Sequence, residues 1–258
     1  MTYLHGHHES VLRAHGWRTA ANSAAFLLPH LRVEHVMLDV GAGPGTITQD
    51  LATHVTKLVA TEVDASTLAL TRTGITASNV DFVIADAHGL PFSDATFDVV
   101  HAHQVLQHVA DPVQALREFR RVTKPGGIVA VRDVDYSAIS LHPGRPELTE
   151  WLSLYRTLAR IDGGEPDAGP RLLGWAQEAG FEQITPSASV WCFATMADRA
   201  YWGGSWAERI QHSRFADKAR AHGVADSTLS DIAQAWRDWA VDPKGWITLT
   251  HGEILARS

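Results

Sequence analysis

The chain has very little cysteine. Among its 258 residues only Cys192 carries a thiol, so no disulfide can form within the chain, and this fits a reducing compartment. Cys192 stands between Trp191 and Phe193, and this apolar setting predicts a buried packing role rather than a nucleophile.

Long apolar runs and clusters of basic residues are also missing. No apolar run follows a basic start, and none approaches the length of a membrane span, so we expect no signal peptide, no membrane span and a cytoplasmic location. The formal net charge is −7 and no Lys/Arg cluster occurs, which argues against a nucleic-acid partner. The length and a hydrophobic content of 45% are typical of a globular protein with a full core.

The most informative segment that is present runs from Leu38 to Thr46. Val36, Met37, Leu38 and Val40 form an apolar strand that leads into Gly41-Ala42-Gly43-Pro44-Gly45, and a helical pattern begins at Ile47. Glycines let a ligand approach backbone N–H groups that side chains would otherwise screen. A strand, a glycine turn and a helix in this order are typical of the nucleotide-binding corner of a doubly wound α/β sheet.

Short apolar strands alternate with helices along the first half of the chain, which indicates a parallel sheet with right-handed crossovers. We expect a helix over 9–31, and Asp111 and Pro112 predict the start of a helix that ends at Val122. Lys124 to Gly127 is expected to form a turn, and residues 197–240 to be helical with a break near Gly223. The other expected strands are 35–40, 58–60, 80–84, 97–102, 128–131, 183–195 and 246–255, and the other expected helices are 46–53, 66–73, 147–161 and 171–179.

Polar side chains follow several of the expected strands. Glu62 ends the second strand about 20 residues after the glycines, where an acid can accept hydrogen bonds from ribose hydroxyls. Asp86 follows the third strand, where a carboxylate can accept from an adenine amino group, and Gln104 follows the fourth. A solvated surface acid at Glu62 and an Asx turn at Asp86 are the alternatives.

The glycine pattern differs from a dinucleotide fingerprint. That fingerprint requires Gly or Ala where this chain has Thr46, and no basic residue stands beside the turn to meet a diphosphate. Asp39 stands before the first glycine instead. An adenosine that carries an amino acid group therefore fits better than a dinucleotide.

The chain resembles the class I S-adenosylmethionine-dependent methyltransferases, of the small-molecule type similar to the ubiquinone/menaquinone C-methyltransferases. The segments that carry the resemblance are Leu38–Thr46, Glu62–Asp64, Asp86–Phe92, Phe97–Val100 and Val105–Gly127. The resemblance implies a Rossmann-like, doubly wound, mostly parallel seven-stranded sheet with helical lid insertions. It also implies one domain over 1–258, made of cap helices in 1–32, a cofactor-binding core in 33–136 and helical substrate or lid segments in 137–170 and 196–243.

The same resemblance implies a role for individual residues. Asp39, Gly41, Ala42 and Gly43 would line the methionine end of S-adenosylmethionine, the cofactor whose product is S-adenosylhomocysteine. The remaining implied contacts are Glu62 on the ribose hydroxyls, Val63 beside the adenine, Asp86 and Ala87 at the adenine edge, and Gln104 near the methionyl backbone. The expected partner is a small-molecule acceptor, apolar or aromatic, and a homodimer is left open.

Methyl transfer needs positioning above all, and a general base only where the nucleophile must lose a proton. His108 and Asp133 are the catalytic candidates, and the other candidate bases after the fourth and fifth strands are His103, Asp135 and Tyr136. Packing is an equal alternative for His108, and a place in the acceptor pocket is expected for Asp133. Arg18 and Asn22 are expected on the N-terminal helix, with Arg18 solvated or paired with the methionyl carboxylate.

The early histidines and the tryptophans each allow more than one interpretation, and so does the function of the chain. No metal site is expected, because the spacing of His5, His7, His8 and His15 matches no closed ligand set. Tryptophans concentrate in the C-terminal half, where core packing is favoured over an aromatic-lined pocket: Trp151, Trp175, Trp191, Trp202, Trp206, Trp236 and Trp239. A nicotinamide oxidoreductase and a non-catalytic S-adenosylmethionine-binding protein are the competing functions.

Overall fold

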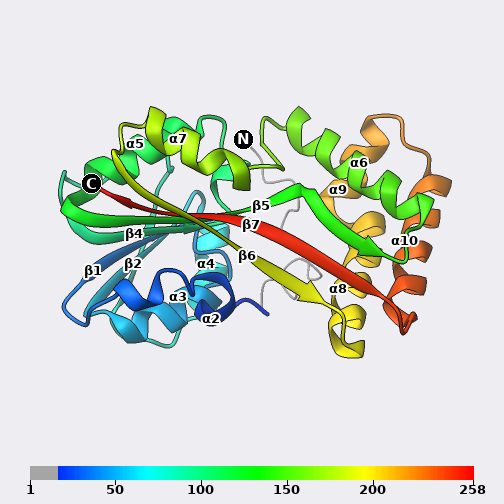
Figure 1. The fold of residues 1–258 in the computed structure, drawn as a ribbon, viewed down its shortest axis with the longest axis horizontal. Coiled ribbons are helices and arrows are strands. Elements are labelled where there is room, and N and C mark those ends of the chain that lie inside the picture. Colours follow the sequence, from blue (N-terminus) through cyan, green and yellow to red (C-terminus); the bar gives the residue numbers. More distant parts are fainter. Residues whose placement is uncertain (1–16) are drawn as a thin grey trace. The chain divides into compact units, whose positions relative to one another are not determined.

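The computed structural model describes residues 17–258, which form two compact units (Figure 1). One unit, called here the sheet unit, holds residues 18–134, 167–189 and 251–258. The other, called here the helical unit, holds Trp17 and residues 135–166 and 190–250. The division falls inside three long strands, β5 (Thr123–His142), β6 (Gln183–Phe193) and β7 (Trp246–Arg257). The expectation of a single domain with a lid stays a prediction.

The strands form one seven-stranded sheet in the order β3-β2-β1-β4-β5-β7-β6, which confirms the expected Rossmann-like architecture. The first four strands are β1 (Val36–Val40), β2 (Lys57–Glu62), β3 (Val80–Ile84) and β4 (Phe97–His103). Neighbouring strands from β3 to β5 run parallel. The sheet is nevertheless mixed, because the end of β7 pairs antiparallel with the start of β5: Gly126 N–H donates to Ser258 O, and Ser258 N–H donates to Gly127 O.

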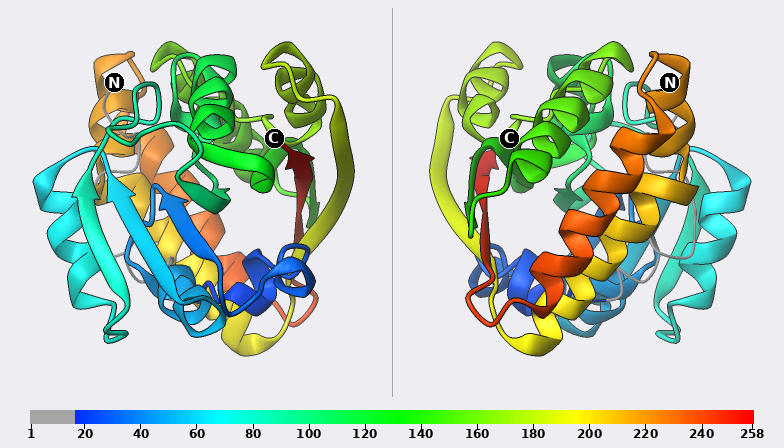
Figure 2. Two further views of the ribbon diagram at one scale, coloured as in Figure 1. Left: turned by 90° about the vertical axis from the view of Figure 1, so that its left-hand side faces the viewer. Right: turned by 90° about the vertical axis from the view of Figure 1, so that its right-hand side faces the viewer.

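Helices cover both faces of the sheet unit. One core cluster joins the sheet to α5 (Pro112–Val122) and α7 (Leu172–Glu178), and a second joins its other face to α2 (Ala20–Ser23) and α3 (Thr46–Leu51). Figure 2 (left) shows α5 and α7 on one side of the strands and the blue α2 and α3 on the other. The remaining helical elements of this unit are α4 (Ala65–Thr73), η1 (Leu28–His30), η2 (Ala52–His54), η3 (Leu106–His108) and η4 (Gly169–Arg171).

The predicted helix ends are borne out where a cap defines them. Asp111 accepts a hydrogen bond from Gln114 N–H and Pro112 is the first residue of α5, as expected. The helix over 9–31 is wrong as a single element: residues 9–16 lie outside the described residues, and beyond them only α2 and η1 form. Thr19 caps α2, and Pro29 falls in the first turn of η1.

The turn expected at Lys124 to Gly127 is instead an irregularity inside β5. Phe97 pairs with Thr123 and Val99 with Ile128, so the intervening residues of β5 have no regular register partner. Gly126 has φ +75°, a left-handed backbone that glycine adopts at no steric cost. The strand also continues to His142, where the sequence suggested a helical segment, before helix α6 (Pro146–Ile161) begins.

Among the described residues, four helices belong to the helical unit: α6, α8 (Met196–His212), α9 (Arg214–Ala221) and α10 (Asp226–Val241). In Figure 2 (right) α8 and α10 lie side by side. The close approach depends on Gly203, because a Cβ atom there would come within 2.8 Å of Trp236 O. The break near Gly223 is confirmed, and a second break occurs at Ser213, whose hydroxyl accepts from Phe215 N–H.

Indole rings fill the interior of the helical unit, as the core interpretation of the tryptophans predicts. Trp151, Trp206, Trp236 and Trp239 are buried, and the ring centroid of Trp151 lies 4.7 Å from that of Trp206 and 4.8 Å from that of Trp236. The prediction for Cys192 is wrong: its side chain is exposed, because neighbours along a strand point to opposite faces and Trp191 and Phe193 take the buried one. No helix among residues 17–258 is long and apolar enough to cross a membrane.

Candidate functional site

The glycine turn after β1 is built from left-handed backbone. Gly41, Gly43 and Gly45 have φ of +69°, +58° and +83°, a region that side chains disfavour. A Cβ atom on Gly41 would also lie 2.6 Å from Val105 Cγ2. At Gly43, by contrast, an added Cβ atom would meet nothing within 4 Å. The turn therefore presents bare backbone at the carboxyl end of the central strand.

Glu62, the last residue of β2, is hydrogen bonded to this turn. Its Oε1 accepts from Gly43 N–H at 2.5 Å, and its side chain is almost fully buried. Burial raises the pKa of Glu62 to about 7, although the backbone hydrogen bonds from Gly43 and Val63 oppose the rise. Val63, the next residue, is 61% exposed. The carboxylate is thus held rigidly beside the glycine turn with an apolar, accessible residue next to it.

Both carboxylate oxygens of Asp39 interact with buried side chains of the protein. His101, its register partner on β4, approaches Oδ1 through Nδ1 at 2.7 Å, and Thr48 Oγ1 donates to Oδ2 at 2.6 Å. The three side chains are buried. Asp39 thereby ties β1 to β4 and to α3 just below the glycine turn, so it orders the turn from beneath.

Asp86 lies in a loop after β3. Its Oδ1 accepts from His88 N–H at 2.9 Å and lies 2.6 Å from His88 Nδ1, and the backbone bond is the main reason why the pKa of Asp86 is lowered. This is the Asx-turn geometry that the sequence left as an alternative. Asp111 N–H donates to His88 Nε2 at 3.3 Å, and Ala87 is buried in the core that faces α5.

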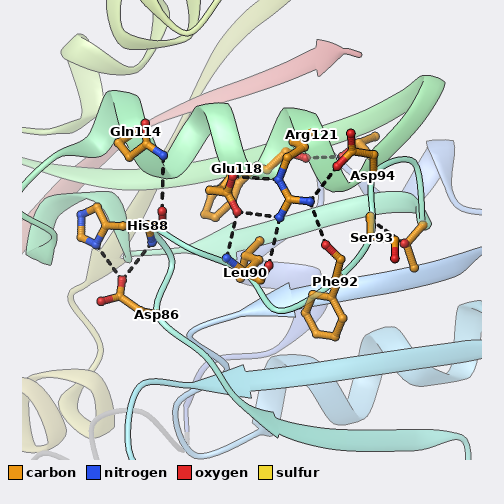
Figure 3. A network of polar contacts seen from close by, with 12 residues as sticks. Asp86, His88, Leu90, Phe92, Ser93, Asp94, Gln114, Glu118 and Arg121 are labelled. Atoms are coloured by element: carbon orange, nitrogen blue, oxygen red, sulfur yellow. Dashed lines mark hydrogen bonds and ion pairs between the residues drawn. The ribbon is translucent and has the colours of Figure 1, made fainter.

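Arg121 on α5 fixes the rest of that loop (Figure 3). Its guanidinium donates to Leu90 O at 2.9 Å and to Phe92 O at 2.8 Å, and it pairs with Glu118 and Asp94. Glu118 in turn accepts from Leu90 N–H at 2.9 Å. The network anchors the segment after β3 to α5, so Asp86 and Ala87 are held in a defined place at the edge of the sheet.

Gln104 follows β4 with a left-handed backbone, φ +54°, an unusual conformation for a residue with a side chain. Its N–H donates to Arg132 O at 2.7 Å. Its amide joins two other segments: Arg18 Nη2 donates to Gln104 Oε1 at 2.8 Å, and Gln104 Nε2 lies 2.9 Å from His251 Nε2. The solvated helix position expected for Arg18 is wrong, since Arg18 precedes α2 and is half-buried on Gln104. Asn22 completes the capping box of α2 with Thr19.

The two catalytic candidates, Asp133 and His108, both contact Gln107. Asp133 is 0% exposed, and its Oδ1 accepts from Gln107 N–H at 3.2 Å. Burial raises the pKa of Asp133 to about 7. The side-chain amide of Gln107 lies 2.9 Å from His108 Nε2, and burial lowers the pKa of His108 to about 3. The carboxyl group of Asp133 is enclosed and holds the segment that leads into η3, and its expected place in the acceptor pocket stays a prediction.

The other candidate bases are dispersed. Asp135 accepts from Ser137 N–H and Oγ, and the Tyr136 ring lies 4.2 Å from that of Tyr155. His103 is buried, with its ring centroid 6.3 Å from that of His251. Within residues 17–258 no group of His, Cys, Asp and Glu side chains could hold a metal ion. The early histidines, His5, His7, His8 and His15, lie outside the described part of the chain.

Sequence reasoning missed the contribution of β7. His251 and Glu253 stand two residues apart on this strand and share the face that carries Leu255. Glu253 pairs with Arg132 of β5 at 3.2 Å and accepts from Ser187 and Ser189 of β6. The signal was present, since His251 and Glu253 continue the every-second-residue pattern of the apolar Ile247 and Leu249 in a strand that was predicted correctly.

Comparison with known proteins agrees with this geometry. Residues 38–131 match the family model described as a methyltransferase domain. The chain is 34% identical over 269 residues to an uncharacterized methyltransferase of Schizosaccharomyces pombe, with 98% of this chain and 95% of that one covered. It is 35% identical over 136 residues to a demethylmenaquinone methyltransferase of Renibacterium salmoninarum, covering 53% of this chain and 54% of that one.

Solved structures show the same fold. The crystal structure of a putative methyltransferase from Bacillus halodurans has a TM-score of 0.58 and 19% identity, and the alignment covers 90% of this chain and 97% of that one. The fold, the matched domain and the nearly full-length relative agree with the resemblance seen in the sequence. The chain therefore belongs to the class I S-adenosylmethionine-dependent methyltransferases.

Proposed function

We propose that this methyltransferase transfers the methyl group of S-adenosylmethionine to a small-molecule acceptor that is apolar or aromatic. Methyl transfer is an in-line displacement at an already activated carbon, so an enzyme accelerates it mainly by orienting the two partners. The observation that carries the proposal is the bare glycine turn with the buried Glu62 carboxylate hydrogen bonded to it at Gly43.

The residues at this edge of the sheet fit the cofactor. In the proposal, Gly41, Ala42 and Gly43 lie along the methionyl part, because an added Cβ atom at Gly43 would meet nothing within 4 Å, which leaves space beside the turn. The N–H groups of Gly41 and Ala42 donate to Thr61 O and that of Gly43 donates to Glu62, so these bonds order the turn. Glu62 accepts from the ribose hydroxyls, for which a carboxylate held by two backbone N–H groups, of Gly43 and Val63, still has acceptor capacity. The other proposed contacts are Val63 beside the adenine, Asp86 and Ala87 at its edge, and Gln104 at the methionyl end.

Asp39 fits a positioning role better than a direct contact. Both of its carboxylate oxygens are bonded to buried side chains, His101 and Thr48. We propose that it orders the turn on which the methionyl part lies. His108 and Asp133 remain the catalytic candidates, and their contacts through Gln107 favour positioning of the segment after β4 over proton transfer.

The comparisons bear on the nature of the acceptor as well as on the cofactor. A relative named as a demethylmenaquinone methyltransferase acts, by that name, on demethylmenaquinone, which supports an apolar or aromatic acceptor. A phosphoethanolamine N-methyltransferase of Haemonchus contortus shares the fold at 16% identity with a TM-score of 0.60, so the fold alone does not choose between acceptors. A cytoplasmic location and a homodimer stay predictions.

Calorimetry with S-adenosylmethionine, S-adenosylhomocysteine and NAD tests the cofactor assignment. Binding of NAD without S-adenosylhomocysteine would favour an oxidoreductase and contradict the proposal. The variant that tests the role of the Glu62 charge is Glu62→Gln, which keeps an acceptor for Gly43 N–H but removes the charge. Its affinity for S-adenosylhomocysteine should fall roughly 10- to 100-fold, since hydrogen bonds to charged groups contribute about 1.5–3 kcal/mol. Glu182→Gln, at an exposed position, is the matched control.

Turnover separates an enzyme from a binding protein. A panel of phenols, quinols, amines and carboxylic acids is incubated with S-adenosylmethionine, and release of S-adenosylhomocysteine is measured. Release that depends on one aromatic member supports the proposal. Tight cofactor binding with no release from any member would favour the non-catalytic alternative.

A further inference from the structure

His88, in the loop after β3, has a contact at each of its four polar atoms. Its N–H donates to Asp86 Oδ1 at 2.9 Å, and its carbonyl oxygen accepts from Gln114 Nε2 at 3.3 Å (Figure 3). In the ring, Nδ1 lies 2.6 Å from Asp86 Oδ1, and Nε2 accepts from Asp111 N–H at 3.3 Å. His88 therefore connects the Asp86 carboxylate with the start of α5.

The two ring contacts determine which nitrogen of His88 carries the proton. The pKa of Asp86 is lowered, chiefly by the backbone hydrogen bond from His88, so the carboxylate is ionised at neutral pH and can only accept. The Nδ1 atom must then donate to Asp86, whereas Nε2 keeps the lone pair that accepts from Asp111 N–H. A neutral imidazole with its proton on Nδ1 supplies this donor and this acceptor at once.

The strand order places the two partners of His88 on opposite sides of the proposed cofactor site. In the sheet, β3 and β4 are separated by β2 and β1, whose carboxyl ends carry Glu62 and the glycine turn. Asp86 follows β3, and the segment after β4 runs from Gln104 to Asp111. His88 thus joins the two segments that flank the site, at the edge where ligands of open α/β sheets bind.

The carboxylate of Asp86 keeps acceptor capacity for a ligand. Both of its contacts with His88 use Oδ1, and a carboxylate has about four lone-pair sites. The side chain of Asp86 is 63% exposed, whereas that of His88 is 29% exposed. The carboxylate is therefore within reach of a ligand, while the ring that holds it is partly covered by the protein.

The second anchor of this loop acts on its backbone. Glu118 accepts from Leu90 N–H, and Arg121 donates to the carbonyl oxygens of Leu90 and Phe92. These bonds fix the path of the chain beyond His88. The direction of the Asp86 carboxylate is fixed by His88, through the two contacts at Oδ1.

We propose that His88 is a positioning residue that directs the Asp86 carboxylate at the adenine amino group and thereby makes the site prefer adenine over a base without this donor. The inference rests on the proposed function, in which Asp86 lies at the adenine edge. The His88 ring cannot turn away from Asp86 without also losing its bond to Asp111. A carboxylate that is already held in place loses less conformational entropy when it binds a ligand.

Calorimetry with S-adenosylhomocysteine and S-inosylhomocysteine tests this preference. In the second ligand a carbonyl oxygen replaces the adenine amino group. The full chain should bind S-adenosylhomocysteine roughly 10- to 100-fold more tightly, as expected for a hydrogen bond to a charged group. His88→Phe keeps a planar ring but removes both ring contacts. It should remove most of the preference by weakening S-adenosylhomocysteine, with little change for S-inosylhomocysteine.

Two further variants separate the roles of the ring nitrogens. In His88→Asn the amide nitrogen takes the place of Nδ1 and can still donate to Asp86, whereas in His88→Gln the amide oxygen takes the place of Nε2 and can still accept from Asp111 N–H. His88→Asn should therefore keep more of the preference than His88→Gln. In an Asp86→Ala background, His88→Phe should not change the preference further, because its effect passes through Asp86.

His54→Ala, at an exposed histidine of η2, is the matched control and should keep the wild-type preference. Thermal unfolding shows whether each variant is folded, and the comparison of His88→Asn with His88→Gln decides the question if His88→Phe does not fold. Failure of the wild-type protein to bind S-adenosylhomocysteine would overturn the proposed function and this inference together.

Three results would overturn this inference alone, each with S-adenosylhomocysteine still bound by the wild-type protein. The first is equal affinity of the wild-type protein for the two ligands. The second is a preference that survives His88→Phe, or an equal loss of affinity for both ligands in that variant. The third is a larger preference in His88→Gln than in His88→Asn.

Discussion

The helical unit fills its interior with indole and phenol rings, whereas the sheet unit buries carboxylates, imidazoles and a guanidinium toward the ends of its strands. Trp151, Trp206 and Trp236 contact one another edge-on or stacked. In the sheet unit Asp39, His101 and Thr48 are bonded at 2.6–2.7 Å in an equally buried place. Apolar rings stabilise by burial, while buried polar groups cost free energy unless they are paired. The contrast indicates that the first cluster serves folding and the second serves the site.

Replacing one ring of the aromatic cluster should cause the largest loss of stability. Trp236→Ala removes a fully buried indole, and a large-to-small change in a core costs about 3–5 kcal/mol. Urea unfolding monitored by far-UV circular dichroism measures the loss. Trp246→Ala, at a side chain that is 48% exposed, is the control and should change stability by less than about 0.5 kcal/mol. Equal losses in the two variants would contradict a core role for Trp236.

A buried carboxyl group of the sheet unit should make stability depend on pH. The folded-state pKa of Asp133 is raised from 3.8 to about 7, so its contribution is fully present below about 4 and is lost as the pH rises through 7. Over that range the loss is on the order of 4 kcal/mol. Asp133→Asn keeps an acceptor for Gln107 N–H and removes the titration.

The measurement is the free energy of unfolding of wild type minus that of Asp133→Asn, at several pH values from 4 to 8.5. The difference should fall as the pH rises. Glu62, whose pKa is also raised to about 7, titrates in both proteins and cancels. A difference that stays flat over this range would show that Asp133 is not enclosed as described.

Removal of a helix N-cap should cause the smallest loss of stability, and the loss should be the same in both units. Thr195 caps α8 in the helical unit by accepting from Asp198 N–H, and Asp111 caps α5 in the sheet unit. Thr195→Ala and Asp111→Ala should each cost about 1 kcal/mol, measured by thermal unfolding. If the two losses differ severalfold, the units differ in local stability as well as in their cores.

The sequence predicted local structure well and long-range pairing poorly. The strand over 80–84 and the helix from Pro112 to Val122 appear with the predicted ends, because periodicity and capping residues are local signals. Lys124 to Gly127 was expected to be a turn for the same local reason. Whether such residues end a strand or interrupt it depends on the partner strand, and here β4 continues the pairing on both sides.

The residues of the candidate site likewise fall into those that local patterns predict and those that only long-range contacts reveal. The glycine turn, Glu62 and Asp86 were found because each follows a strand within a short motif. His251 and Glu253 were not, since β7 lies far along the chain and reaches β5 by antiparallel pairing. Arg18 likewise contacts Gln104 across 86 positions. No local pattern reports such contacts.

By itself the sequence determined the strand, turn and helix that present bare backbone after β1, because glycine conformation and alternating burial are properties of neighbouring residues. It also favoured an adenosine with an amino acid group as the ligand over a dinucleotide, since the acids and glycines stand at short, regular offsets. Only the tertiary structure decided which polar residues share the opposite half of the sheet. That choice depends on which strands become neighbours, and strand order follows from burying both faces at once rather than from any single segment.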